Sequence, residues 1–326
     1  MWVLSAALLV GFLVLFKSAD LFVTGSIATA RNLKIPSILI GLTIVALGTS
    51  APEIFVAAAS SIEGKPGIAV GNAIGSNIAN IGMVLGITAL IVPLGFRRES
   101  LAHDLPIMAV ATITAGFVLS DYTMSFIDGL LLVGVLLFFV ICLIRNHRNN
   151  KNVLDVIAEE IENEDIPEMS TVKATVILVV SLIFLLASAE ILVWTVTEIA
   201  RKMGISELII GLTVIAVGTS LPELVVSISS ATKGQNDLAV GNIIGSNIFN
   251  ILIVLAIPAF TAESVFSSEL FWRDYMGMLV MTGVLMLAAY TPFKKAGISR
   301  PEGAIMVMLW FCYLIYLYYS GVAQSL

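Results

Sequence analysis

One apolar stretch that contains a carboxylate occurs twice in the chain, at an offset of 170 residues. The first copy is Gly41–Ile54, GLTIVALGTSAPEI, and the second is Gly211–Leu224, GLTVIAVGTSLPEL, with 9 of 14 residues identical. Each copy places a glutamate directly after a proline. A carboxylate at membrane depth is costly and usually faces a pathway or a cavity, and a proline there frees backbone carbonyls. We therefore expect the two stretches to face each other at one ion site.

The composition indicates a polytopic membrane protein. Of its 326 residues, 58% are hydrophobic and only 12% are charged, and the mean hydropathy is +1.01. Soluble domains have about 45–50% apolar and about 25% charged residues. The net charge of −6 provides no basic face for nucleic acid, and the sequence has no phosphate-binding loop. We expect a transporter rather than an enzyme, with no cofactor and with the lipid bilayer as its surroundings.

The hydropathy pattern predicts an all-α fold of ten transmembrane helices, because a span needs about 20 mostly apolar residues. The first run has no positive n-region and continues as an apolar pattern, so it is predicted to be a true helix rather than a signal peptide. The predicted helices cover residues 2–30, 37–62, 67–93, 103–120, 125–145, 171–200, 206–232, 237–260, 270–290 and 301–320.

The two halves of the chain are related as an inverted repeat. Residues 1–145 form the first five-helix repeat, 146–170 an acidic linker, and 171–326 the second repeat. Ile68–Asn80, IAVGNAIGSNIAN, matches Leu238–Asn250, LAVGNIIGSNIFN, at 10 of 13 positions with the same offset. Five is an odd number of crossings, so the second half must enter the membrane from the opposite side. Transporters with this plan hold their substrates near the midplane, at the interface of the repeats.

The distribution of Lys and Arg predicts the orientation. The loops on the side of the N-terminus carry 4 of these residues and the loops on the other side carry 12. Because cytoplasmic loops are enriched in Lys and Arg, both termini are expected outside the cell and the linker in the cytoplasm.

Helical spacing groups several oxygen-bearing side chains around each glutamate. Thr49 and Ser50 precede Glu53 by four and three residues, so all three share a face. Pro52 is expected to bend the helix and to expose carbonyls near Ala46. The third helix adds Ser76 and Asn80, four residues apart. The second half repeats the same set, as Ala216, Thr219, Ser220, Glu223, Ser246 and Asn250.

Every candidate ligand is an oxygen atom, and this favours a hard cation. Calcium takes 6–8 oxygen ligands in flexible geometry. Two buried carboxylates supply about −2 charge, which one Ca²⁺ or two Na⁺ would neutralise. An empty site carries uncompensated buried charge. We therefore expect that it cannot easily change from being open to one side of the membrane to being open to the other. The sequence thus provides a physical basis for obligatory exchange of ions.

Other intramembrane groups have structural interpretations. Lys17 and Asp20 are three residues apart and are expected to pair. Asp104 and Asp274 are predicted to begin helices, where the helix dipole stabilises a carboxylate. Paired glycines in the third and eighth helices are spaced for close helix contact, and they are Gly71, Gly75, Gly241 and Gly245.

The two copies of G-T-S-x-P-E, each followed by G-N-x-I-G-S-N-I-x-N, resemble the α-repeats of the sodium/calcium exchanger family, in the Ca²⁺:cation antiporter superfamily. The short linker is similar to that of prokaryotic-type exchangers of the plasma membrane. The resemblance implies exchange of Na⁺ for Ca²⁺ at a central site formed by helices 2, 3, 7 and 8, with helices 1 and 6 sliding across it. It implies that Glu53 and Glu223 are shared Ca²⁺/Na⁺ ligands and that Asn80 and Asn250 flank the centre. The remaining implied ligands are the hydroxyls of Thr49, Ser50, Ser76, Thr219, Ser220 and Ser246 and the carbonyls of Ala46 and Ala216.

Alternative functions stay open at the level of the sequence. Some relatives, including potassium-dependent exchangers, have Asp where this chain has Asn250, and the amide argues against potassium co-transport. The proton-coupled branch usually has Gly-Asn where this chain has Gly-Thr-Ser, which disfavours Ca²⁺/H⁺ or other cation/H⁺ exchange without excluding it. A cation channel, or a membrane protein with a structural ion, would share the same oxygen-rich site.

Overall fold

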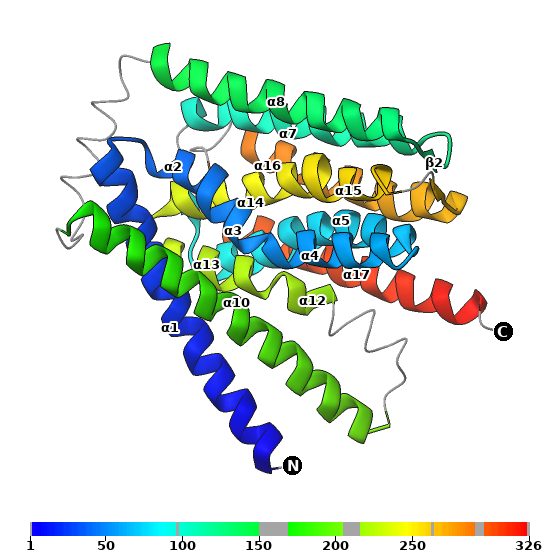
Figure 1. The fold of residues 1–326 in the computed structure, drawn as a ribbon, viewed down its shortest axis with the longest axis horizontal. Helices are drawn as coiled ribbons and strands as arrows, with labels where there is room; N and C mark the ends of the chain where they lie inside the picture. The colour runs from blue at the N-terminus through cyan, green and yellow to red at the C-terminus, as the bar shows by residue number, and fades with distance from the viewer. Residues whose placement is uncertain are drawn as a thin grey trace.

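The computed structural model describes residues 2–95, 98–149, 169–204, 216–261, 264–290 and 297–324. These residues are almost entirely helical, which confirms the predicted fold class (Figure 1). Seven helices in this part are long and apolar enough to cross a membrane, and a bent pair, Ser37–Thr49 with Ala51–Ile62, brings the number to eight. A shorter apolar helix, Asp104–Leu119, coincides with the fourth predicted span. Of the seventh predicted span, residues 206–215 lie outside the described residues.

The first half contains five helical segments, three of them unbroken. They are α1 (Trp2–Leu33), α7 (Arg98–Leu119) and α8 (Phe126–Asn149). The second predicted helix is divided into α2 (Ser37–Ile40), the π-helix η1 (Gly41–Val45), α3 (Ala46–Thr49) and α4 (Ala51–Ile62). The third is divided into α5 (Pro66–Ala79), the π-helix η2 (Asn80–Leu85) and α6 (Gly86–Ile91).

The second half repeats most of these divisions. Its segments are α10 (Thr171–Lys202), α12 (Ala216–Thr219), α13 (Leu221–Thr232), α14 (Asn236–Phe249), η4 (Asn250–Val254), α15 (Ala256–Ala259), η5 (Leu270–Tyr275), α16 (Met276–Tyr290) and α17 (Arg300–Gln324). The predicted boundaries agree to within a few residues, except that α7 begins five residues earlier than predicted and α8 and α17 each end four residues later. Residues 150–168 of the predicted linker lie outside the described residues.

Two short antiparallel strand pairs demonstrate the inversion of the halves. β1 (Leu94–Gly95) pairs with β4 (Gly297–Ile298), and β2 (Thr123–Met124) pairs with β3 (Ser264–Val265). Helix α7 runs from β1 to β2, and its counterpart α16 runs from β3 to β4. Since β1 lies beside β4 and β2 beside β3, α7 and α16 run in opposite directions.

The proline of each repeated stretch breaks its helix as predicted. Pro52 is the second residue of α4, and the helix axis turns by 43° between α3 and α4. Ser50, at the junction, has φ −83° and ψ 8°, and Ser220 has nearly the same values, φ −90° and ψ 7°. A proline has no N–H for the preceding turn, and its ring crowds the carbonyl four residues back. The third residue after each serine is the glutamate, which therefore lies in the first turn of a new helix.

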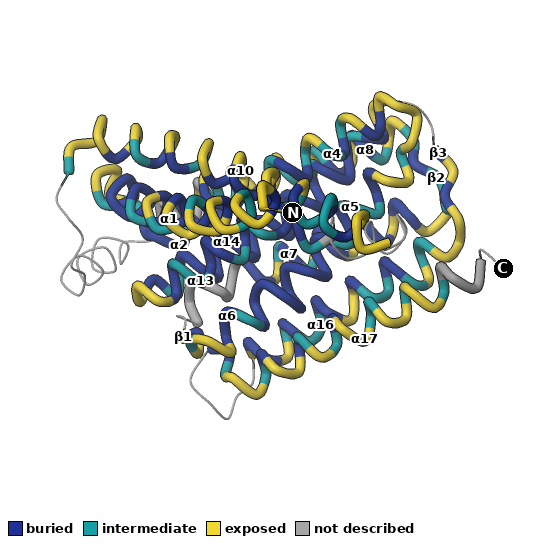
Figure 2. Tube along the Cα trace, turned by 90° about the horizontal axis from the view of Figure 1, so that it is seen from below, coloured by how far each residue is buried: buried dark blue, intermediate teal, exposed yellow. Residues whose placement is uncertain are grey.

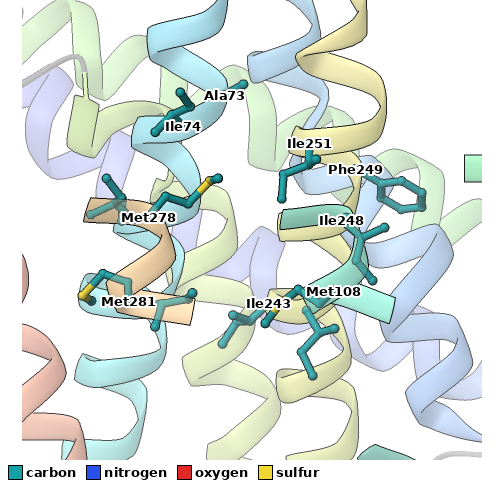
Figure 3. Close-up of a cluster of buried hydrophobic side chains, with 14 of the residues drawn as sticks. Ala73, Ile74, Met108, Ile243, Ile248, Phe249, Ile251, Met278 and Met281 are labelled. Atoms are coloured by element: carbon teal, nitrogen blue, oxygen red, sulfur yellow. The ribbon is translucent and has the colours of Figure 1, made fainter. Parts of the chain in front are cut away.

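The middle segments of the two halves form the core. In α5–η2–α6, 78% of the apolar 18-residue segment is buried inside the protein. The corresponding share is 83% in α14–η4–α15 and only 17% in α17. Figure 2 shows the exposed residues on the outer helices and the buried ones between them. Apolar side chains from α5, α14 and α16, such as Ile74, Ile243 and Met278, fill this interior (Figure 3). The exposed apolar residues on the outer helices are those expected to face lipid.

Helices α1 and α10 form a separate layer. They pack along each other and cross the remaining helices obliquely (Figure 1). The close approach is set by small residues, because a Cβ at Gly25 would lie 2.9 Å from the backbone nitrogen of Leu178. This layer lies against α13 and α2.

The paired glycines of α14 pack closely against α2 and η1. A Cβ at Gly241 would lie 2.7 Å from the carbonyl oxygen of Ile38, and one at Gly245 would lie 2.6 Å from that of Leu42. The predicted close helix contact is therefore confirmed for α14. The residues that correspond to Ile38 and Leu42 in the second half, 208 and 212, lie outside the described residues, so the contact predicted for Gly71 and Gly75 stays a prediction.

The explanation of Asp104 and Asp274 by helix starts is wrong. Both residues lie inside helical segments and are buried, at 5% and 8% exposure. Asp274 is held by Arg273, whose Nε and Nη2 donate to its two carboxylate oxygens at 2.7 and 3.0 Å, and by the Tyr313 hydroxyl at 2.9 Å. The sequence missed this cluster because Tyr313 lies 39 residues away on α17.

We predict that Gly245→Val destabilises the protein by about 1–3 kcal/mol, because the added atoms overlap the backbone of η1. The measurement is the thermal midpoint of the detergent-solubilised protein. Gly134→Val is the control, since Gly134 is exposed on α8 and its Cβ meets no described atom within 4 Å. Equal midpoints for the two variants would contradict the packing described here.

Candidate ion-binding site

The two glutamates of the repeated stretches lie at equivalent places in the structure. Glu53 is the third residue of α4 and Glu223 the third residue of α13, and neither has any exposed surface. Each carboxylate sits in the first turn of its helix, where the helix dipole and the free N–H groups favour a negative charge. The broken helices thus carry two acids into the interior without a compensating base.

Hydrogen bonds join the carboxylates to both halves. The hydroxyl of Ser50 donates to Oε1 of Glu223 at 3.1 Å, across the interface between the halves. The hydroxyl of Ser76 donates to Oε1 of Glu53 at 3.4 Å. Since Ser50 lies three residues before Glu53 in the chain, its bond to Glu223 brings the two glutamates to one site. None of the ion pairs among the described residues includes Glu53 or Glu223.

A second group of oxygens gathers around the carbonyl of Ala46. This oxygen accepts the backbone N–H of Ser50 at 3.0 Å, and the hydroxyls of Thr49 and Ser246 lie 3.3 and 3.5 Å from it. The Thr49 hydroxyl is also 3.1 Å from Oδ1 of Asn242 and 3.5 Å from the Ser246 hydroxyl. The Ala46 carbonyl therefore keeps its helical bond and in addition meets side chains of the other half.

Several buried polar atoms at this place have no hydrogen-bond partner among the described residues. They are Oε2 of Glu53, Oε2 of Glu223, Oγ of Ser220, and both side-chain amide atoms of Asn80 and of Asn250. Leaving a buried polar group unsatisfied costs about 1–3 kcal/mol, and more for a charged group. The carboxylate, hydroxyl and amide oxygens of this set are the ligands that hard cations take. The amide N–H groups cannot ligate a cation and can donate to water.

The predicted site residues are brought together to different degrees. Glu53, Glu223, Ser50, Ser76, Thr49, Ser246 and the Ala46 carbonyl are linked by the hydrogen bonds above. Asn80 and Asn250 are fully buried at the starts of η2 and η4. Thr219 is half-buried in α12, which begins at Ala216, and no contact among the described residues joins either of them to a carboxylate.

Ser227 is a polar neighbour that the sequence analysis missed. Its hydroxyl accepts the side-chain N–H of Asn242 at 3.2 Å, and it is fully buried. Ser227 lies four residues after Glu223, on the same face of α13. Comparison of the two repeats does not reveal Ser227, because the equivalent residue of the first half is Ala57. The helical spacing from Glu223 would have found it.

The surroundings of the site differ at its two ends. On the side of α13, α1 packs along the helix and Asn242 is fully buried. On the side of α4, α10 makes no comparable contact, and Asn72, the counterpart of Asn242, is only half-buried. The Nδ2 of Asn72 donates to the backbone oxygen of Glu53 at 3.3 Å. Within the part of the chain that the structure describes, the α13–α14 end is therefore closed and the α4–α5 end is less covered.

Comparisons with known proteins agree over nearly the whole chain. Residues 3–145 and 173–319 match the family model described as sodium/calcium exchanger protein. The chain is 36% identical to inner membrane protein YrbG of Escherichia coli over 97% of each protein. It is 31% identical to sodium/calcium exchanger MaX1 of Methanosarcina acetivorans, over 96% of this chain and 97% of that one. A solved structure of the sodium-calcium exchanger NCX_Mj, soaked with 2.5 mM Na⁺ and 1 mM Sr²⁺, matches with a TM-score of 0.81 and 32% identity, covering 97% of this chain and 99% of that chain.

We predict that Ca²⁺ raises the thermal midpoint of the purified protein and that this stabilisation is lost in Glu223→Gln. A ligand at about 100 times its Kd stabilises the state that it binds by about 2.7 kcal/mol, and removal with a chelator should reverse the shift. Glu190→Gln is the control, since that carboxylate is exposed on α10. A full Ca²⁺ shift in Glu223→Gln would contradict the paired-carboxylate site.

Proposed function

We propose a function for this chain from the family to which it belongs, the sodium/calcium exchanger proteins: it exchanges Na⁺ for Ca²⁺ across a membrane by alternating access. Members of this family are membrane transporters, and an enzymatic reaction forms no part of the proposal. The transported ions are substrates of the site between the two halves.

The observation that carries the proposal is the pair of fully buried carboxylates, one from each half. Each carboxylate accepts a hydrogen bond from a serine hydroxyl. Two negative charges in a low-dielectric interior are strongly unfavourable unless cations compensate them. One Ca²⁺ or two Na⁺ would provide the required charge. Because both ions use the same carboxylates, binding of one excludes the other, and the protein crosses between its two exposures only when the site is filled.

The neutral oxygens around the carboxylates support Na⁺ as the second ion. Proton coupling requires only the two carboxylates, whereas a metal ion needs several oxygens at once. Ser50 and Ser76 already contact the carboxylates, and Thr49 and Ser246 lie beside the Ala46 carbonyl. Carbonyls at a helix break are used for Na⁺ in other transporters. At the centre, Asn250 supplies a neutral amide where an acid would add a further titratable charge.

We assign the residues of the site as follows. Glu53 and Glu223 hold Ca²⁺ and also contribute to holding Na⁺. Na⁺ is held in addition by the carbonyl of Ala46 and by the hydroxyls of Thr49, Ser50, Ser76 and Ser246. Asn80 and Asn250 flank the centre, where their amide groups accept from or donate to hydrating water. The remaining ligands of the proposal, from the hydroxyl and carbonyl groups of the second half, are Thr219, Ser220 and Ala216.

The proposed orientation places both termini outside a prokaryotic plasma membrane and the linker in the cytoplasm. The bias of Lys and Arg, 12 against 4, supports it. In this orientation the ends of α4 and α10 face outward, and the end of α13 faces the cytoplasm. The less covered α4–α5 end is then the extracellular approach to the site.

The test is Ca²⁺ uptake into proteoliposomes under separately imposed Na⁺, K⁺ and H⁺ gradients. We predict that an outward Na⁺ gradient alone drives Ca²⁺ above its equilibrium level, and that Glu53→Gln abolishes this uptake while Glu190→Gln keeps it. Uptake driven by a proton gradient and not by Na⁺ would establish Ca²⁺/H⁺ exchange instead. Ca²⁺ flux that only dissipates its own gradient would identify a channel.

A further inference from the structure

A lysine at the end of α13 binds α1 at three atoms. The Nζ of Lys233 lies 2.7 Å from Oδ1 of Asp20, 2.8 Å from the backbone oxygen of Asp20 and 2.7 Å from Oγ1 of Thr24. Lys17, one turn earlier, lies 3.7 Å from the other carboxylate oxygen of Asp20, which confirms their predicted pairing. The side chains of Lys233 and Asp20 are 30% and 44% exposed, so the contact lies at the edge of the packed interface.

The equivalent positions of the repeat carry two acidic residues instead of a lysine and an aspartate. With the offset of 170 residues, Lys233 corresponds to Glu63, at the end of α4, and Asp20 corresponds to Glu190, on α10. Glu63 is paired with Lys65 at 2.9 Å, and Glu190 is exposed. The contact that joins α1 to α13 therefore has no equivalent between α10 and α4 among the described residues.

We propose that Lys233, Asp20 and Thr24 form a one-sided latch that holds α1 over α13 and keeps the α13 end of the site closed. This inference rests on the proposed function, alternating access, and on the sliding of helices 1 and 6, here α1 and α10, that the family resemblance implies. In the opposite arrangement α10 would lie on α4 as α1 now lies on α13. Glu190 would then approach Glu63, and the two like charges would repel. The latch thus favours the arrangement that is closed at α13.

The strength of the latch sets the expected effect. Exposed ion pairs contribute about 0.2–1 kcal/mol, and at 1.4 kcal/mol for each factor of ten the upper value corresponds to about a fivefold change in an equilibrium. The latch is therefore a bias that ion binding can overcome, and it leaves the site itself unchanged. Its loss should open the α13 end more often without affecting the affinity of the carboxylates.

The test is hydrogen–deuterium exchange of the full-length protein in lipid nanodiscs, with the same ions throughout. We predict that Lys233→Gln accelerates exchange in α13 and in the second half of α1 by about two- to fivefold, while α17 is unchanged. Lys65→Gln is the matched control, because Lys65 lies at the equivalent end of the first half and its ion pair among the described residues is with Glu63. The double variant D20K/K233E restores the ion pair with exchanged charges and should recover part of the lost protection, because a carboxylate at 233 cannot donate to the backbone oxygen of residue 20.

Three results would overturn the latch: unchanged exchange in Lys233→Gln, an equal acceleration in Lys65→Gln, or no recovery in the charge-swapped variant. If Lys233→Gln does not fold, Asp20→Asn removes only the carboxylate and should give a smaller acceleration in the same two segments. The measurement does not depend on transport. A failure of Na⁺-driven uptake in the wild type would refute the proposed function and leave the exchange result standing.

Discussion

The repulsion between Glu53 and Glu223 is the constraint on which the rest of the structure depends. Both carboxylates are fully buried, and a hydroxyl of one half binds the carboxylate of the other. The helix breaks before them are necessary, because they place each acid in the first turn of a helix, where free N–H groups stabilise negative charge. The helix dipoles and two serine hydroxyls compensate only part of the charge, and in the function that we propose a bound cation supplies the remainder.

The repeated sequence produces a symmetric centre and asymmetric surroundings. The breaks at Ser50 and Ser220 and the π-helices at Asn80 and Asn250 occur at the same offset. The inversion was predicted from an odd number of helices in each half, and the strand pairs, which make α7 and α16 antiparallel, agree with it. Alternating access requires two arrangements of similar free energy, which an inverted repeat provides. The differences lie where α1 covers one broken helix and α10 leaves the other uncovered.

The sequence alone predicted the helices, the inversion and the local grouping of ligands, because these follow from hydropathy, parity and helical spacing. It could not predict which end of the site is more covered, since Asn72 and Asn242 are identical residues that differ in burial. The contact of Ser50 with Glu223 spans 173 residues, and the contact of Lys233 with Asp20 spans 213. Such contacts depend on how the helices pack, and local spacing does not specify them. For the same reason, the explanation of Asp274 by a helix start missed its contact with the hydroxyl of Tyr313, 39 residues away.

The most direct test of the account is a structure of the protein with Sr²⁺ or Ca²⁺, in which the anomalous signal locates the ion. We predict one divalent ion that contacts carboxylate oxygens of both Glu53 and Glu223, at about 2.3–2.6 Å for Ca²⁺. The same peak should disappear when Na⁺ is in large excess. An ion bound to only one of the two carboxylates, or located away from both, would contradict the claim that a cation joins the two halves.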